Sequence, residues 1–209
     1  MTSNVPKSFA KMAEIMHKPT HFSKLEAENL LRMFYKLTSV KLDRTKFRDV
    51  LHNYFNMTDD ILMDRVFRAF DNDNDSYINV DEWMRGLSVF LKGTLEEKIK
   101  YCFNVYDLNS DGHITREEIF HILKNSLTKQ PTEEDPDEGV KDLIDQTIRR
   151  MDYDHDGRLS LYDYKTAVEA EPVLLLQAFG TCLPSDEVRE KFVKRLQTID
   201  EAERKFRLT

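Results

Sequence analysis

Three acidic segments of twelve residues, starting at Asp71, Asp107 and Asp152, constrain the fold of this chain more than any other feature. In each segment, oxygen-bearing side chains stand at positions 1, 3 and 5, and a carboxylate stands at position 12. This spacing is typical of a tight loop between two helices that wraps around a calcium ion. The ion takes oxygen ligands only, and position 7 adds a main-chain carbonyl. The sequence therefore predicts three calcium-binding helix–loop–helix units, the units known as EF-hands.

The loop at residues 107–118 satisfies the pattern at every position. Gly112 stands at position 6, where the backbone makes its sharp turn, and the acid at position 12 is a glutamate that can bind through both oxygens. The predicted ligands are Asp107, Asn109, Asp111, His113 through its carbonyl, and Glu118. We expect this loop to be the most dependable of the three calcium sites.

The other two loops each depart from the pattern at one position. In the loop at 71–82, Ser76 replaces the glycine, and a left-handed backbone at a non-glycine residue costs about 1 kcal/mol. In the loop at 152–163, Asp163 replaces the final glutamate and is one methylene shorter, which favours the smaller coordination number of magnesium. The predicted ligands are Asp71, Asp73, Asp75, Tyr77 and Glu82 in the first loop, and Asp152, Asp154, Asp156, Arg158 and Asp163 in the third, with Tyr77 and Arg158 acting through their carbonyls.

The repeat extends toward the N-terminus as a fourth unit. Successive loops start 36 residues apart (71 to 107) and 45 residues apart (107 to 152), and the extra length falls in the Pro- and acid-rich stretch 129–139, a predicted solvated linker. One repeat before Asp71, the equivalent loop would start at Tyr35 and end at Lys46, where a carboxylate belongs. This unit cannot bind calcium, although Leu42 keeps the apolar residue of position 8.

Apolar residues recur at helical spacing along the whole chain, so we predict an all-α EF-hand protein with four hands in two paired lobes. The expected division is an N-terminal pair at 1–92, a C-terminal pair at 93–170, and C-terminal helices at 171–209. The stretch 172–183 is too apolar to lie free in water, and 185–208 forms an amphipathic helix. Either could be displaced from a groove by a target, or be a permanent part of the core.

Composition and charge exclude several other functions. The formal net charge of −7 disfavours a nucleic-acid partner, and no apolar run is long enough to span a bilayer. The two cysteines lie outside any CxxC or His-rich context, which indicates a reduced, cytoplasmic environment without a disulfide framework or zinc. Every clustered acid fits the register of metal ligation, and no nucleophile or phosphate-binding motif accompanies it. We therefore expect no enzymatic activity.

The arrangement of four hands, the first degenerate, resembles the neuronal calcium sensor group. That group usually carries an N-myristoylation signal with glycine after the initiator Met, whereas Thr2 follows it here, so no membrane anchor is expected. A closer resemblance is to the calaxins, the calcium sensors of ciliary outer-arm dynein. It is carried by NMTDDILMDRVFRAFDNDND (56–75), GTLEEKIKYCFNVYDLNSDG (93–112), KNSLTKQPTEEDPDEGVKDL (124–143) and LLLQAFGTCLP (174–184).

The resemblance implies a sensor that binds a dynein heavy chain of the outer arm in the axoneme of cilia and flagella. Tubulin or the docking complex would be further contacts in this part of the cytoskeleton, and calcium would change how the motor drives beating. Two alternatives stay open at this point. One is a regulatory partner of an enzyme such as a phosphatase, in the manner of calcineurin B or a neuronal calcium sensor. The other is a calcium buffer.

Overall fold

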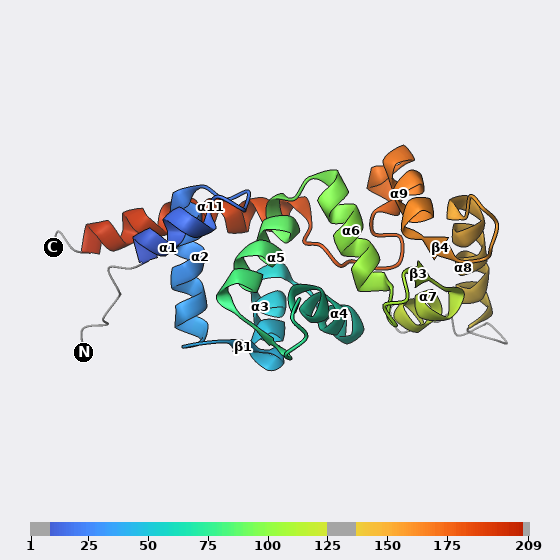
Figure 1. The fold of residues 1–209 in the computed structure, drawn as a ribbon, viewed down its shortest axis with the longest axis horizontal. Helices are drawn as coiled ribbons and strands as arrows, with labels where there is room; N and C mark the ends of the chain where they lie inside the picture. The colour runs from blue at the N-terminus through green and yellow to red at the C-terminus, as the bar shows by residue number, and fades with distance from the viewer. Residues whose placement is uncertain (1–8, 125–136, 207–209) are drawn as a thin grey trace. The chain divides into compact units, whose positions relative to one another are not determined.

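The computed structural model describes residues 9–124 and 137–206, with residues 199–206 described by their backbone alone. The predicted all-α class is confirmed, and the strands are two residues long (Figure 1). The helices are α1 (Phe9–Met16), α2 (Lys24–Leu37), α3 (Arg44–Phe55), α4 (Asp60–Phe70), α5 (Val80–Lys92), α6 (Leu95–Tyr106), α7 (Arg116–Leu123), α8 (Glu138–Met151), α9 (Leu161–Ala170), α10 (Pro172–Leu175) and α11 (Asp186–Phe206). None of the described helices is long and apolar enough to cross a bilayer.

The four short strands pair the hands two by two. β1 (Leu42–Asp43) is antiparallel to β2 (Tyr77–Ile78), with Leu42 opposite Ile78. β3 (His113–Ile114) pairs in the same way with β4 (Leu159–Ser160), with Ile114 opposite Leu159. The apolar residue at position 8 of each loop therefore meets its counterpart in the partner loop. The unit predicted from Tyr35 to Lys46 is structurally a hand, because its Leu42 makes this contact.

The chain divides into two compact units, each with its own core. Unit 1 holds the described residues of 1–57, 70–93 and 184–209, and unit 2 holds those of 58–69 and 94–183. In unit 1, Trp83 is fully buried between the rings of Phe34 and Phe47. In unit 2, the buried rings of Tyr106 and Tyr164 pack edge to face. Each unit thus contains one of the two strand pairs and a group of buried aromatic rings.

The segment 172–183, predicted to be too apolar for water, is packed in unit 2. Phe179 and Cys182 are buried, and the Tyr101 hydroxyl donates to the carbonyl of Cys182 at 3.2 Å. The hydroxyl of Tyr106 donates to the carbonyl of Gly180. The start of the segment is different, because Val173 is fully exposed. Aromatic hydroxyls of unit 2 therefore hold the second half of this segment by its backbone.

Helix α11, predicted at 185–208, packs in unit 1 against α2, which it crosses in Figure 1. Phe192 and Leu196 are buried, and the ring of Phe192 lies 4.8 Å from that of Phe55, centroid to centroid. The amide of Asn29 donates to the carbonyl of Leu196 at 2.6 Å. Ile199 lies outside the residues whose side chains are described. The two C-terminal segments thus contribute to different units.

The predicted linker at 129–139 falls mainly outside the described residues. Its last part is different from the prediction, because α8 begins at Glu138 and includes Gly139. The N-cap residue Asp137 makes no capping hydrogen bond through its side chain. The helix therefore starts without the local sequence signal by which helix starts are normally recognised.

Candidate metal centres

The three acidic loops share one backbone conformation. Position 4 is left-handed in each, at Asn74 (φ 55°), Ser110 (φ 61°) and His155 (φ 59°). Position 6 is left-handed as well, at Ser76 (φ 68°), Gly112 (φ 87°) and Gly157 (φ 85°). The prediction that Ser76 adopts the backbone of a glycine is therefore confirmed. The first loop accepts the conformational cost of about 1 kcal/mol at this residue.

The first aspartate of each loop is buried and accepts a hydrogen bond from the N–H of position 6. The N···O distance is 2.9 Å in all three loops, from Ser76 to Asp71, from Gly112 to Asp107 and from Gly157 to Asp152. Ser76 thus leaves the position of the Asp71 carboxylate unchanged relative to the glycine-containing loops.

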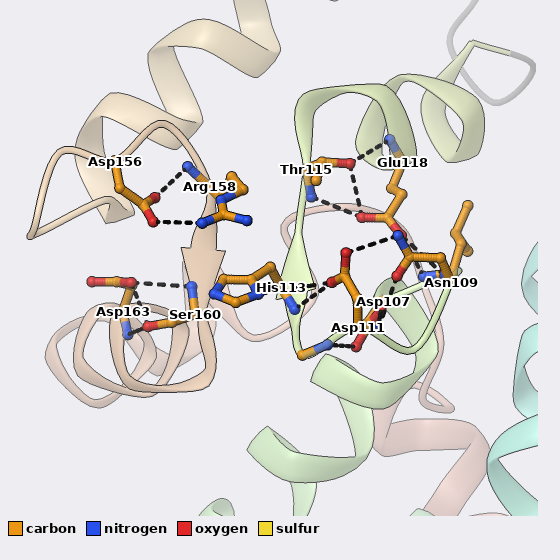
Figure 2. Close-up of polar contacts among 12 residues, drawn as sticks. Asp107, Asn109, Asp111, His113, Thr115, Glu118, Asp156, Arg158, Ser160 and Asp163 are labelled. Carbon is orange, nitrogen blue, oxygen red and sulfur yellow. Dashed lines mark hydrogen bonds and ion pairs between the residues drawn. The ribbon is translucent and has the colours of Figure 1, made fainter.

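The carboxylate at position 12 bridges the two ends of its loop. Oε1 of Glu118 accepts from the N–H groups of Leu108 and Asn109 at 2.9 and 3.1 Å, and Oε2 accepts from the N–H and hydroxyl of Thr115 at 2.8 Å each (Figure 2). Glu82 does the same, with Oε1 toward Asn72 and Asp73 and Oε2 toward Asn79. These residues also complete the capping boxes of α7 and α5, so one side chain serves the loop and the start of the exit helix.

Asp163 makes the same bridge with a shorter reach. Its Oδ2 accepts from the N–H of Ser160 at 3.0 Å and from the Ser160 hydroxyl, which caps α9 (Figure 2). Its Oδ1 accepts from the N–H of Tyr153 at 3.3 Å, longer than the 2.9 Å of the equivalent bonds to Glu82 and Glu118. The missing methylene therefore loosens the bridge on the side that faces the start of the loop.

Two groups of three carboxylates converge within the loops. Oxygens of Asp71, Asp73 and Glu82 lie within 4.8 Å of one another in the first loop, and oxygens of Asp152, Asp154 and Asp156 do so in the third. Asp75 and Asp163, predicted as ligands beside them, are not in these groups. In the loop at 107–118, the Asn109 side chain donates to Asp111 at 2.9 Å (Figure 2).

The donor sets fit a hard divalent cation. Oδ1 of Asp152 is buried and has no hydrogen-bond partner within the described part of the chain. A buried, unpartnered carboxylate oxygen is costly unless a cation compensates it. The predicted ligands are side-chain and main-chain oxygens, which are the ligands that calcium and magnesium prefer. Calcium, or magnesium in the loop at 152–163, would be held by the predicted residues and would relieve the repulsion among their carboxylates.

Hydrogen bonds and cations hold the position-5 carboxylates in their ionised form. The pKa of Asp75 is lowered chiefly by its bond to Lys41, and that of Asp111 chiefly by the Asn109 amide and then the His113 N–H. The pKa of Asp156 is lowered chiefly by the N–H of Arg158. Because their pKa values are lowered, these side chains are anionic at neutral pH.

In the first hand, the residues at the first and last positions of the degenerate loop make other contacts. Tyr35 packs on Phe9 and Phe34, with ring centroids 5.3 and 5.4 Å away. The N–H of Lys46 donates to Asp43, which caps α3. The sequence did not predict a role for another residue of this hand, Lys41. Lys41 makes an ion pair with Asp75 of the second hand. The sequence indicated this contact only through the position of Lys41, which is position 7 of the degenerate loop and directly precedes the strand that pairs with the second loop.

Comparison with known proteins agrees with this architecture. A family model described as an EF-hand domain pair matches residues 96–169, and one described as an EF hand matches residues 62–88. Calaxin from Xenopus laevis is 57% identical over 201 residues, which cover 92% of this chain and 96% of that protein. Calaxin from Homo sapiens is 54% identical over 195 residues, covering 89% and 92%. Calcineurin B from Candida glabrata is 31% identical over 168 residues, covering 78% and 91%.

Both family models agree with the acidic loops in pointing to calcium. The identity to calaxins extends well beyond the loops, over nine-tenths of the chain. The chain therefore belongs to the calaxin family of EF-hand calcium sensors, which are not enzymes.

Proposed function

We propose that this protein is the calcium sensor of an outer dynein arm and changes ciliary or flagellar beating when calcium rises. The observation that carries the proposal is the 54–57% identity to calaxins over about nine-tenths of the chain. Its place would be the axoneme, and its partner a dynein heavy chain, with tubulin or the docking complex as further contacts. The geometry of the loops supports a sensor, because metal ligands and helix starts share the same side chains.

The three loops would bind calcium. The ligands we assign are Asp71, Asp73, Asp75, Tyr77 and Glu82, then Asp107, Asn109, Asp111, His113 and Glu118, then Asp152, Asp154, Asp156, Arg158 and Asp163. When bound, calcium supplies charge that neutralises the carboxylates. Calcium binding would then act on the exit helices, because Glu82, Glu118 and Asp163 each complete the capping box of the helix that follows their loop.

A route from the third loop to the C-terminal segment supports this role. Tyr164 follows Asp163 directly, is fully buried in α9, and donates its hydroxyl to the carbonyl of Leu176. A shift of the Asp163 carboxylate would move the start of α9, and with it the anchor of the segment 172–183. We propose that this displacement exposes apolar surface for the target. The division into functional parts at 1–92, 93–170 and 171–209 belongs to the same proposal.

The experiment is a pull-down from demembranated axonemes with the full-length protein, in calcium and in chelator with magnesium. A dynein heavy chain should be captured, in an amount that changes with calcium. The matched control is the triple variant Glu82→Gln, Glu118→Gln and Asp163→Asn, which alters position 12 of all three loops and whose capture should no longer depend on calcium. Absence of any dynein heavy chain in both conditions would refute the proposed partner.

A second candidate is a regulatory partner of a phosphatase. It is favoured by the 31% identity to calcineurin B from Candida glabrata over 78% of this chain. Co-purification of a phosphatase catalytic chain in place of dynein would establish it. A pure buffer would differ from both, because binding of a hydrophobic dye would stay unchanged on addition of calcium.

A further inference from the structure

Lys41 reaches from the metal-free first hand onto a ligand of the second. It stands at position 7 of the degenerate loop, immediately before β1, which pairs with β2 of the loop at 71–82. Its Nζ forms an ion pair with Oδ2 of Asp75, and both side chains are about one-third exposed (39% and 32%). The pairing of β1 with β2 therefore places the ammonium group of Lys41, which belongs to the first hand, beside the second loop.

The ion pair takes up the oxygen that Asp75 would offer to calcium. Oδ1 of Asp75 already accepts from the N–H of Tyr77 at 2.8 Å, and Oδ2 is the atom in contact with Lys41. The converging carboxylates of this loop are Asp71, Asp73 and Glu82, without Asp75. The ammonium group therefore contacts the carboxylate oxygen of Asp75 that does not accept from Tyr77.

The equivalent carboxylates in the other two loops have partners from their own loop. Asp111 lies 3.8 Å from Nδ1 of His113, and Asp156 accepts from the Arg158 guanidinium at 3.3 Å (Figure 2). Both partners stand at position 7 of the same loop. Among the position-5 acids of the three loops, only Asp75 is shown paired with a cation supplied by the neighbouring hand.

We propose that Lys41 is a tethered competitor for calcium, through which the first hand sets the calcium affinity of the second. An exposed ion pair contributes little to folding stability, but here it competes with the metal for one oxygen. Binding of calcium must break the pair and leave a positive charge beside a divalent ion, which is repulsive even in a solvated site. The inference rests on the assignment of residues 71–82 as a calcium site.

The test is a calcium titration of the full-length protein followed by ¹H–¹⁵N NMR. The amides of Ser76, Gly112 and Gly157 each donate to the first aspartate of their own loop, so each reports on one site. Lys41→Gln should raise the affinity seen at Ser76 by about threefold to tenfold and leave the other two sites unchanged. Lys41→Arg, which keeps the charge, should stay near the wild-type affinity.

The matched control is Lys46→Gln, which removes the same charge at position 12 of the same degenerate loop. If Lys46→Gln raises the affinity at Ser76 as much as Lys41→Gln does, the specific competition is refuted. An unchanged affinity in Lys41→Gln refutes it as well. In an Asp75→Asn background, Lys41→Gln should have little effect. If the Ser76 amide of the wild type does not respond to calcium, the assignment of the loop fails and this inference fails with it.

Discussion

Replacing Glu118 by glutamine should abolish the most complete calcium site while keeping the size of the side chain. In the structure, the two oxygens of Glu118 accept four hydrogen bonds, from the N–H groups of Leu108 and Asn109 and from the N–H and hydroxyl of Thr115. Glutamine keeps one acceptor oxygen and places an NH₂ group where the other stood. That NH₂ group then faces donors on one side of the loop.

The size of the effect follows from these contacts. A hydrogen bond made by a charged group contributes about 1.5–3 kcal/mol, and we use this range for each metal–oxygen contact. In the variant, the metal loses one ligand oxygen and also the negative charge of the other. Two such contributions amount to about 3–6 kcal/mol. Because about 1.4 kcal/mol corresponds to a tenfold change in affinity, calcium binding should weaken by at least about a hundredfold. The fold itself should lose only about 1–3 kcal/mol, the cost of the unsatisfied donors.

The assay is calorimetry with calcium at physiological magnesium, together with the NMR response of the Gly112 amide. The matched control is Glu117→Gln, which removes the same charge from the exposed neighbouring residue and should leave the site intact. Thermal unfolding checks that the variant is folded. If the Gly112 amide of Glu118→Gln still responds at the calcium concentrations that saturate the wild type, the assignment of Glu118 as the closing ligand is wrong.

Three further predictions concern other parts of the molecule. Asp163→Glu should restore the reach of position 12 and raise the preference of its loop for calcium over magnesium by roughly tenfold, measured by calorimetry with each ion. Phe192→Ala should destabilise unit 1 by about 3–5 kcal/mol in denaturant unfolding, and Val193→Ala on the half-buried side of α11 by much less. Burial would raise the pKa of Glu26, but the Lys92 ammonium, Gln197 and a backbone amide lower it. Its stabilisation is therefore present above the ordinary glutamate pKa and lost as the pH falls through the lowered value, so Glu26→Gln should flatten the acid limb of the stability profile.

Local spacing predicted the loops because every ligand of a loop lies within twelve residues of chain. The left-handed backbone at Ser76 and the contact of Leu42 with Ile78 both follow from their positions in the repeat. The start of α8 at Glu138 could not be predicted in this way. It falls in an acidic, proline-containing stretch, and its N-cap makes no side-chain bond that the sequence would reveal.

Contacts between residues far apart in the sequence could not be predicted from local spacing. The amphipathic pattern of α11 predicted which face would be buried, but not that Asn29 would donate to the Leu196 carbonyl. The spacing of the repeat likewise placed Lys41 in the hand without a metal, but it did not indicate that Lys41 pairs with Asp75. That partner depends on the register of β1 against β2, which sets one loop beside the other.

The three loops differ less in their ligands than in what surrounds them. The position-6 N–H lies 2.9 Å from the first aspartate in each loop, so Ser76 displaces no ligand and its cost stays in the backbone. The remaining differences are at position 3, where Asn109 stands in place of an aspartate, at position 12, where Asp163 reaches less far, and at position 5, where Asp75 is paired with a cation from another hand. An affinity order deduced from ligand identity alone would therefore misplace the loop at 71–82. It has one ligand carboxylate more than the loop at 107–118, and Lys41 offsets part of that advantage.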